Sequence, residues 1–529
     1  AGDAMTSANN NVALGYSALT TNTTSNNNIA IGPFALNAFN ITTGGDGYNV
    51  AIGSNAGVSV TTGIQNTLIG GLAGDVLTDA DYNVAVGVSA LGADTLGSQS
   101  TAIGYSALTN QNFTTATNSN NTAVGYQAGV NVTTGLSNTL VGSLTGDALT
   151  DADFNVAIGL GSLGADTRGS KSVAVGTAAL QAQNFETATD SHNTAVGHNA
   201  GNDVTTGKFN TLIGSLAGDT ITDGELNTAL GYNALTAETR GQRAVAIGGF
   251  ALQNQNITTQ SESYNTAVGY AAGITLQSGT KNTFIGALAG DGTDDGNNNV
   301  AVGYQALSAN CGNNNVAVGE EAGFSVTGSG NILIGTGAAQ NTTALTSGEN
   351  NIVIGLNART SAADSNNTIV MGENVSGQAN SNFTFGVGTT DSNIAFGATS
   401  ITAPSDERYK EDITTSTAGL SFINDLRPVT FKWKKEKDVP TNSDSYVEGS
   451  DTRVMLSNGE TNHGFIAQEV KTVIDNHPEI KDGFRMWAEQ EGADKRQRLG
   501  STELIPMLTK AIQELSAKND ALEARIATL

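Results

Sequence analysis

The chain has 529 residues, more than one typical domain needs, so at least two domains are expected. Residues 1–400 carry 27 acidic and 7 basic side chains, a net charge of −20, which argues against binding of nucleic acid or an anionic membrane surface; residues 401–529 carry 22 and 17, a net of −5. The single cysteine, Cys311, excludes an intrachain disulfide framework, and the absence of any run of about 18 apolar residues argues against membrane insertion.

The N-terminal part repeats a short unit of the form Asn-Thr/Val-Ala-Val/Ile-Gly. Examples are "NVAIG" ending at Gly53, "NTLIG" at Gly70 and "NVAVG" at Gly87. Successive glycines are mostly 17 residues apart, and a step of 21 recurs every fourth time, so the pattern from Gly53 repeats after 72 residues at Gly125. A fixed period of this size predicts stacked coils rather than a globule.

Each unit alternates side chains over a short β-branched stretch before it turns at glycine, which predicts one brief strand per coil and a second strand and loops from the rest. Small inward residues such as Ala51 and Ala123 make each coil's core thin. A thin roll buries too little apolar surface to stand alone, so we expect three chains to associate along the long axis. With coils about 4.8 Å apart, about 21 coils predict a rod of roughly 100 Å.

The stretches "NTAVGYQAG", "NTLIGSLAG" and "NVAVGYQAL" resemble the head repeats of YadA-type trimeric autotransporter adhesins over about residues 9–375. The resemblance implies a left-handed parallel β-roll that forms a homotrimer. Coils of that family are usually shorter, so the 17- and 21-residue coils here carry longer loops. We predict a mainly β fold with three parts: a β-roll over residues 1–380, a transition segment over 381–404 and a small α/β domain over 405–529.

Acidic loops recur once per 72 residues, as "GDVLTDADYN" (74–83) and "GDALTDADFN" (146–155). Their carboxylates are candidates for a calcium site, because calcium prefers several oxygen ligands. The alternative is that they form solvated turns. The candidate residues are Asp75, Asp79, Asp81, Asp147, Asp151 and Asp153.

At the border of the two compositions lies "PSDERYKEDI" (404–413). By itself this stretch predicts a helix start, with Ser405 as the N-cap and Asp406 and Glu407 at the positive helix end. Ser405 and Lys410 are five residues apart, which does not place them on one face of a helix. If the two side chains work together, the chain has to bend, or a neighbouring chain has to supply the lysine.

The C-terminal part predicts a helix before Pro428, an alternating strand from Val429, and a strand that runs into a helix over 463–474. Residues 504–529 predict a coiled-coil helix, because apolar residues recur at alternating steps of four and three; the polar residue in this seam can set its register. Three heptads are marginal alone, so we expect the helix to associate within a trimer. The seam consists of Leu508, Ile512, Leu515, Asn519, Leu522, Ile526 and Leu529.

Four stretches in this order, "SDERYK", "LRPVTFKW", "HGFIAQEV" and "ELIPMLTKAIQEL", resemble the C-terminal intramolecular chaperone domain of phage endosialidases and tail fibres. The resemblance implies a Ser/Lys self-cleaving dyad. Ser405 would attack the carbonyl of Pro404 and break the Pro404–Ser405 bond, with Lys410 as general base and Asp406 as an orienting group. No activity on an external substrate and no cofactor other than the candidate calcium is expected.

The first hypothesis is therefore a homotrimeric phage tail fibre or tailspike, located in the virion tail, with its own self-cleaving chaperone. Its partners would be a host-surface glycan or outer-membrane protein and other tail proteins. The second hypothesis is a bacterial trimeric surface adhesin. The sequence ends in a soluble coiled coil rather than a membrane anchor, which disfavours that alternative. A third is a polysaccharide-degrading tailspike, disfavoured because the repeat contains no distinct catalytic domain.

Overall fold

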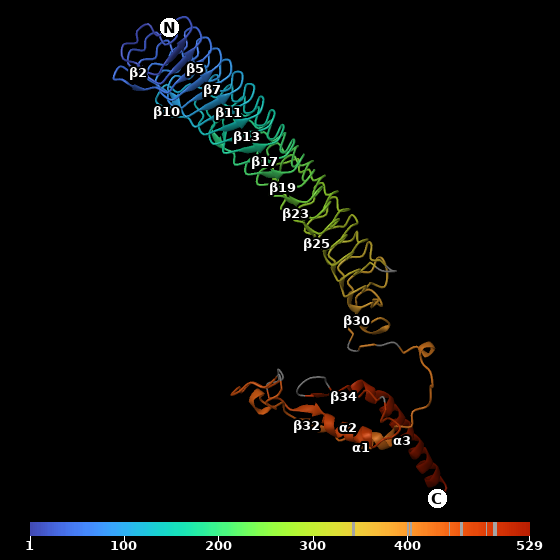
Figure 1. The fold of residues 1–529 in the computed structure, drawn as a ribbon. Coiled ribbons are helices and arrows are strands. Elements are labelled where there is room, and N and C mark those ends of the chain that lie inside the picture. The colour runs from blue at the N-terminus through green and yellow to red at the C-terminus, as the bar shows by residue number, and fades with distance from the viewer. Residues whose placement is uncertain are drawn as a thin grey trace. The chain divides into compact units, whose positions relative to one another are not determined.

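The computed structural model describes residues 1–340, 344–398, 401–402, 405–443, 445–454, 459–482, 484–489 and 495–529. The chain divides into two compact units, Ala1–Pro404 and Ser405–Leu529 (Figure 1). The first unit is a parallel β-solenoid and the second is a small α/β unit that ends in a long helix. The predicted mainly β fold with a parallel roll is thus confirmed, with about 22 coils in place of the 21 expected.

One sheet runs the length of the first unit, and each coil contributes one short parallel strand to it. The strands are β1 (Val12–Leu14), β3 (Ile29–Ile31), β5 (Val50–Ile52), β6 (Thr67–Ile69), β7 (Val84–Val86), β9 (Thr101–Ile103), β11 (Thr122–Val124), β12 (Thr139–Val141), β13 (Val156–Ile158), β15 (Val173–Val175), β17 (Thr194–Val196), β18 (Thr211–Ile213), β19 (Thr228–Leu230), β21 (Val245–Ile247), β23 (Thr266–Val268), β24 (Thr283–Ile285), β25 (Val300–Val302), β26 (Val316–Val318), β27 (Ile332–Ile334), β28 (Ile352–Ile354), β29 (Ile369–Glu373) and β30 (Asn382–Val387).

The last strand of this sheet, β31 (Thr390–Ala395), pairs antiparallel with β30 and so ends the run of parallel coils. The 21-residue coils add a second, two-residue parallel pairing, and among the described residues the second strand predicted for every coil forms only there. These pairs are β2 (Ser25–Asn26) with β4 (Gly45–Asp46), β8 (Gly97–Ser98) with β10 (Thr117–Asn118), β14 (Gly169–Ser170) with β16 (Thr189–Asp190), and β20 (Gly241–Gln242) with β22 (Ser261–Glu262).

The strands alternate as their sequence predicts. In β5 the middle residue, Ala51, is fully buried in the coil, while Val50 and Ile52 face outward. The glycine that follows each strand is needed for close stacking. Gly53 has φ +142°, and a Cβ there would lie 2.3 Å from the carbonyl oxygen of Gly70 in the next coil. A side chain at this position would therefore clash with the neighbouring backbone.

A ladder of buried asparagines joins successive coils. The backbone N–H of Asn66 donates to Oδ1 of Asn49 at 3.0 Å, and that of Asn83 donates to Oδ1 of Asn66 at 2.9 Å. The amide nitrogen of Asn66 in turn donates to the Ala80 carbonyl at 2.8 Å. The ladder satisfies backbone groups that the coil geometry buries, which explains why the repeat begins with Asn.

The second unit packs three helices around one small apolar core. Its elements are η1 (Glu407–Tyr409), α1 (Leu420–Asp425), β32 (Val429–Phe431), η2 (Glu436–Asp438), β33 (Asn462–Gly464), α2 (Ala467–Asp475), β34 (Trp487–Glu489), β35 (Gln497–Leu499), η3 (Ser501–Glu503) and α3 (Leu504–Ala527). The core is centred on Phe422 of α1, Val470 and Ile474 of α2, and Leu504 and Met507 of α3. Only the first half of α3 is held by this core.

Candidate functional site

Ser405 and Lys410 meet at the start of the second unit. The ammonium nitrogen of Lys410 lies 2.8 Å from Oγ of Ser405, within hydrogen-bond distance. The short 3-10 helix η1 turns the chain between them, and Lys410 itself is extended, with φ −122° and ψ 141°. The bend that a same-chain pair requires is therefore present. Pro404 lies outside the described residues.

Asp406, not Ser405, caps this turn. Its Oδ1 accepts a hydrogen bond from the backbone N–H of Arg408 at 2.9 Å, so the predicted N-cap role of Ser405 is wrong. The sequence suited either residue, because both serine and aspartate are preferred caps. Capping by Asp406 leaves the Ser405 hydroxyl free for Lys410.

Asp406 also binds the guanidinium of Arg408. The Nε atom of Arg408 lies 3.1 Å from Oδ1 and 3.0 Å from Oδ2 of Asp406. The side-chain and backbone hydrogen bonds from Arg408, aided by the charge of Lys410, hold the pKa of Asp406 below its usual value. We name these contacts the Asp406–Arg408 clamp. Ser405, Asp406, Arg408 and Lys410 are all exposed in the single chain.

The segment that follows the dyad is tied to α3. The carboxylate of Glu514 accepts a hydrogen bond from the backbone N–H of Leu420 at 2.9 Å, so a residue of α3 caps the first turn of α1. Gly419 makes this approach possible, because a Cβ there would lie 2.8 Å from Glu514 and from Lys510. The cap joins residues 94 positions apart, which no local pattern reveals.

Two further contacts hold the core of the second unit. Arg427, before β32, forms an ion pair with Glu469 of α2. His477, after α2, lies between Glu479 and Asp425, with ring nitrogens 3.0 Å and 2.9 Å from their carboxylates. Those hydrogen bonds, Glu479 first and Asp425 second, raise the pKa of His477 above its ordinary value.

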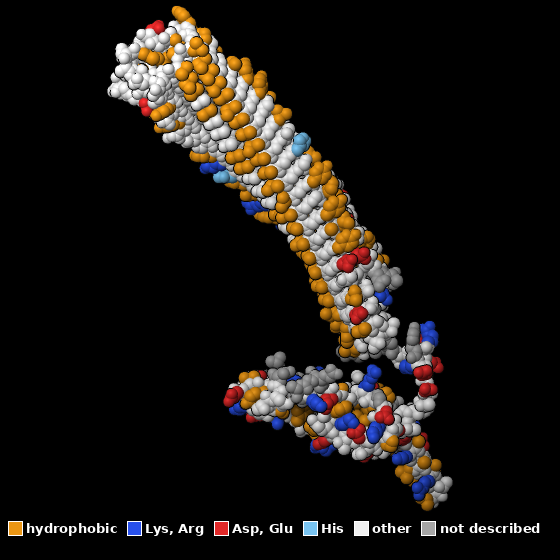
Figure 2. All heavy atoms as spheres, viewed as in Figure 1, with side chains coloured by type: hydrophobic (Ala, Val, Ile, Leu, Met, Phe, Trp, Pro, Cys, Tyr) orange, Lys and Arg blue, Asp and Glu red, His pale blue; other side chains and the backbone are white. Residues whose placement is uncertain are grey.

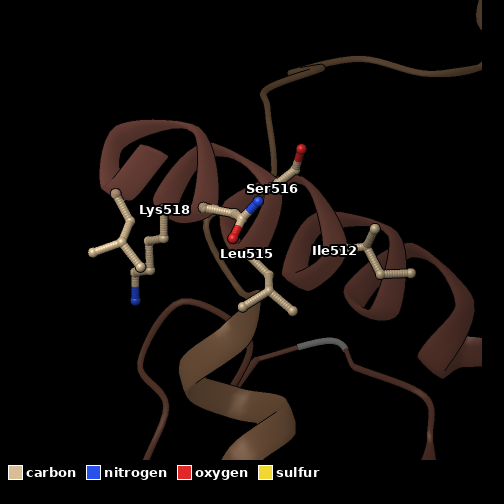
Figure 3. A pocket seen from close by; sticks show the side chains of 6 residues that line it. Ile512, Leu515, Ser516 and Lys518 are labelled. Carbon is tan, nitrogen blue, oxygen red and sulfur yellow. The ribbon is translucent and has the colours of Figure 1, made fainter. Parts of the chain in front are cut away.

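The predicted seam of α3 is exposed on one side of the helix. Its apolar members are solvent-exposed in the single chain, for example Ile512 at 66% and Ile526 at 62%. Ile512, Leu515, Asn519 and Leu522 line a shallow groove with Ser516 and Lys518 (Figure 3). Ile505, which the sequence analysis left out, occupies the preceding heptad position and is 61% exposed.

The outward face of the solenoid sheet is also apolar. Strand residues on both sides of the buried middle position project outward, and Figure 2 shows hydrophobic side chains in stripes along the coils. Exposed examples are Ile69, Ile103, Ile158, Leu230, Ile285 and Ile334. A soluble single chain rarely exposes a continuous apolar stripe of this length, so the face is a candidate contact surface.

The candidate calcium residues have separate uses in the structure. Oδ1 of Asp81 accepts from the backbone N–H of Ile64 at 2.7 Å, and Asp153 does the same for Leu136. Asp151 lies 3.3 Å from the guanidinium of Arg168, and Asp79 accepts from the Thr62 hydroxyl. Partial burial raises the pKa of Asp75 and of Asp147. Among the described residues no three acidic, histidine or cysteine side chains form a group that could hold a metal ion.

Sequence analysis missed a buried polar group in the long coils. Asp94 accepts from the backbone N–H groups of Gly97 and Phe113 at 3.0 Å each, and from the Gln111 amide at 2.6 Å. Gln111 also accepts from Asn121, and so carries the asparagine ladder across a coil where Ser100 replaces Asn. Burial raises the pKa of Asp94, against the lowering effect of its hydrogen bonds. Equivalent groups form at Asp166 with Gln183 and at Glu238 with Gln255.

Comparison with known protein families gives one match. Residues 405–477 match the model of the family described as chaperone of endosialidase. The match begins at Ser405 and covers the dyad, α1, β32, β33 and α2, and the resemblance stated for the C-terminal part is confirmed. No curated protein and no solved structure matched the chain. In the part of the chain that is described, no helix has the length and apolar character needed to cross a membrane.

Proposed function

We propose that this chain, which joins a parallel β-solenoid to a chaperone-of-endosialidase domain, is a homotrimeric tail-fibre rod whose C-terminal unit assembles the rod and then cuts itself off. The observation that carries the proposal is the 2.8 Å contact between Lys410 and Ser405 at the first residues of the second unit. Cleavage before Ser405 would separate the two compact units without cutting either of them.

The chemistry of the cut follows from the dyad. Lys410, as the neutral amine, takes the proton of the Ser405 hydroxyl while Oγ attacks the carbonyl carbon of Pro404. The peptide C–N bond breaks, the proton passes to the freed α-amine of Ser405, and an ester joins Pro404 to the Ser405 side chain. Water then hydrolyses the ester to give a C-terminal carboxylate on Pro404 and restore the hydroxyl. Asp406 orients the pair through its clamp with Arg408.

Two exposed apolar surfaces support the trimer. The outward face of the solenoid sheet and the seam of α3 both present apolar side chains that a single chain leaves in water. Burying such area is favourable by about 25 cal/mol per Å², so association along both surfaces would stabilise the assembly. The family of the C-terminal domain is associated with trimer formation, which agrees with this arrangement.

The rod would serve attachment in the virion tail. Its long repetitive surface suits contact with a glycan or an outer-membrane protein of a host cell, and other tail proteins would hold its upstream end. The distinguishing observation against a cell-surface adhesin is the C-terminal domain, whose family is named for a chaperone of endosialidase. A binding test would apply the purified trimer to host cells and to cells stripped of surface glycan.

Self-cleavage is the first test of the proposal. Wild-type chain and the variants Ser405→Ala and Lys410→Ala would be expressed in parallel and analysed by denaturing gel and intact mass. We expect the wild type to give a fragment that begins at Ser405, and both variants to remain whole. An uncut wild type under conditions where it is fully folded would overturn the self-cleavage part of the proposal.

The rod and its assembly are tested separately. Analytical ultracentrifugation of the uncut Ser405→Ala chain should give three times the mass of one chain. A monomer at micromolar concentration would contradict the trimer whatever the gel shows.

A further inference from the structure

We propose that α3 joins three copies of this chain in parallel and in register, with Lys518 of each copy paired to Glu523 of the next. This inference rests on the proposed trimer and deepens it, because it names the orientation and the residues that set it. The occupant of the α3 groove is therefore a second copy of the same helix.

The seam defines the heptad positions. Ile505, Ile512, Asn519 and Ile526 are seven residues apart and take position a, while Leu508, Leu515, Leu522 and Leu529 take position d. The seam thus covers all of α3, including the half that packs on α1. Leu504, Met507 and Ala511 bury the other side of that half, so the seam remains accessible beside the core.

Charge complementarity decides the orientation. With this assignment Lys518 stands at position g and Glu523 at position e of the following heptad. In a parallel coiled coil a g residue faces the e residue five positions later on the neighbouring helix, which places Lys518 opposite Glu523. In an antiparallel arrangement g residues face each other, so Lys518 and Arg525 would be brought together as like charges.

The groove shows that these positions lie on one surface. Lys518 and Ser516 flank Ile512, Leu515, Asn519 and Leu522 (Figure 3). In the single chain the Asn519 amide donates to Glu523 at 3.1 Å, so the carboxylate already leans toward the seam. A polar residue at one a position favours a single register, because any shift places it against leucine or isoleucine.

Cysteine cross-linking tests the orientation in the full chain. Asn519→Cys and Ile526→Cys would each be introduced into the Ser405→Ala chain, which stays whole, and oxidised at low protein concentration. The native Cys311 is buried in the rod and gives a low background. In a parallel in-register seam both variants form interchain disulfides, which appear as linked chains on a non-reducing gel. An antiparallel seam can bring at most one of the two positions opposite itself.

The matched control is Ala524→Cys at position f, on the outer side of the helix, which should not cross-link. If both seam cysteines fail while ultracentrifugation still gives an oligomer, the parallel seam is overturned and the trimer stands. If the chain is monomeric, the proposed function fails first.

Charge reversal tests the pair itself. In the Ile526→Cys chain, Lys518→Glu and Glu523→Lys should each slow disulfide formation by about threefold or more, because each places like charges together. The double variant restores opposite charges and should return the rate to that of the parent. A double variant no faster than either single variant would overturn the Lys518–Glu523 pairing.

Discussion

Asp406 holds the dyad turn in two ways that substitution can separate. It caps η1 by accepting from the Arg408 backbone, and it binds the Arg408 guanidinium. Asp406→Asn keeps an oxygen for the cap and loses the ion pair, whereas Asp406→Ala loses both. We expect Asp406→Ala to slow self-cleavage by about tenfold, as a lost cap of ~1 kcal/mol would, and Asp406→Asn to slow it less. The measurement is the single-turnover rate of appearance of the Ser405 fragment.

The matched control for this prediction is Glu407→Ala, which removes an exposed carboxylate from the same turn. A positioning role lowers the rate at every pH and leaves the shape of the pH profile unchanged. A shifted profile would instead mean that the carboxylate tunes the dyad electrostatically, and an unchanged rate in Asp406→Ala would refute the clamp.

His477 makes the second unit sensitive to pH. Its folded pKa is raised by Glu479 and Asp425, so its contribution to stability is complete below about 6.5 and is lost as pH rises through the folded pKa. The melting temperature of this unit in the Ser405→Ala chain should therefore fall as pH rises above about 6.5. His477→Gln should flatten that slope, whereas His463→Gln, at an exposed position in β33, should leave it unchanged.

Among the elements, the turn after each strand gives the sharpest test of coil stacking. Gly70 has φ +140°, and a Cβ there would lie 2.3 Å from the Gly87 carbonyl oxygen. Its neighbour Gly71 has no such restriction, because the nearest atom to a Cβ lies 3.9 Å away. Gly70→Ala should destabilise the rod by about 2 kcal/mol or more, and Gly71→Ala should change little. Thermal unfolding of both variants measures this difference, and equal midpoints would contradict the stacking argument.

The strands and their spacing were predictable because each coil repeats one local signal. Alternation around Ala51 fixes the inward side, and the glycine that ends each unit marks the turn. The Asp94–Gln111 contact was not predictable in the same way, since it joins side chains 17 residues apart that carry no distinctive motif. It becomes visible only when the coils are stacked and the interruption of the asparagine ladder at Ser100 is seen.

The site was predictable in its residues but not in its geometry. The pattern around Ser405 suited a helix cap and a nucleophile equally well. The choice depends on which side chain reaches the Arg408 N–H, a distance that the sequence does not contain. The α3 seam followed from its heptads, yet Ile505 was overlooked, because the preceding Pro–Met–Leu stretch suggested a helix start rather than a full heptad.

At the scale of the whole molecule, the order of assembly matters more than any single contact. The solenoid pairs strands 17 or more residues apart in parallel, and such contacts form slowly because loops must close first. A C-terminal unit that brings three chains together raises the local concentration of the remaining strands. Removing that unit after folding would leave the rod stable without the element that built it.

The last prediction follows from this order. Cleaved wild-type rod and uncut Ser405→Ala chain have the same solenoid contacts, so they should unfold in denaturant at similar rates. They should differ on refolding: the uncut chain should recover its trimer, whereas the cleaved rod, freed of residues 405–529, should recover at least tenfold more slowly or aggregate. Refolding would be followed by ultracentrifugation after dilution, with the second unit added as a separate chain as a control. Equal recovery of the two chains would mean that the second unit does not direct assembly, because the rod alone would then contain all the information for its own register.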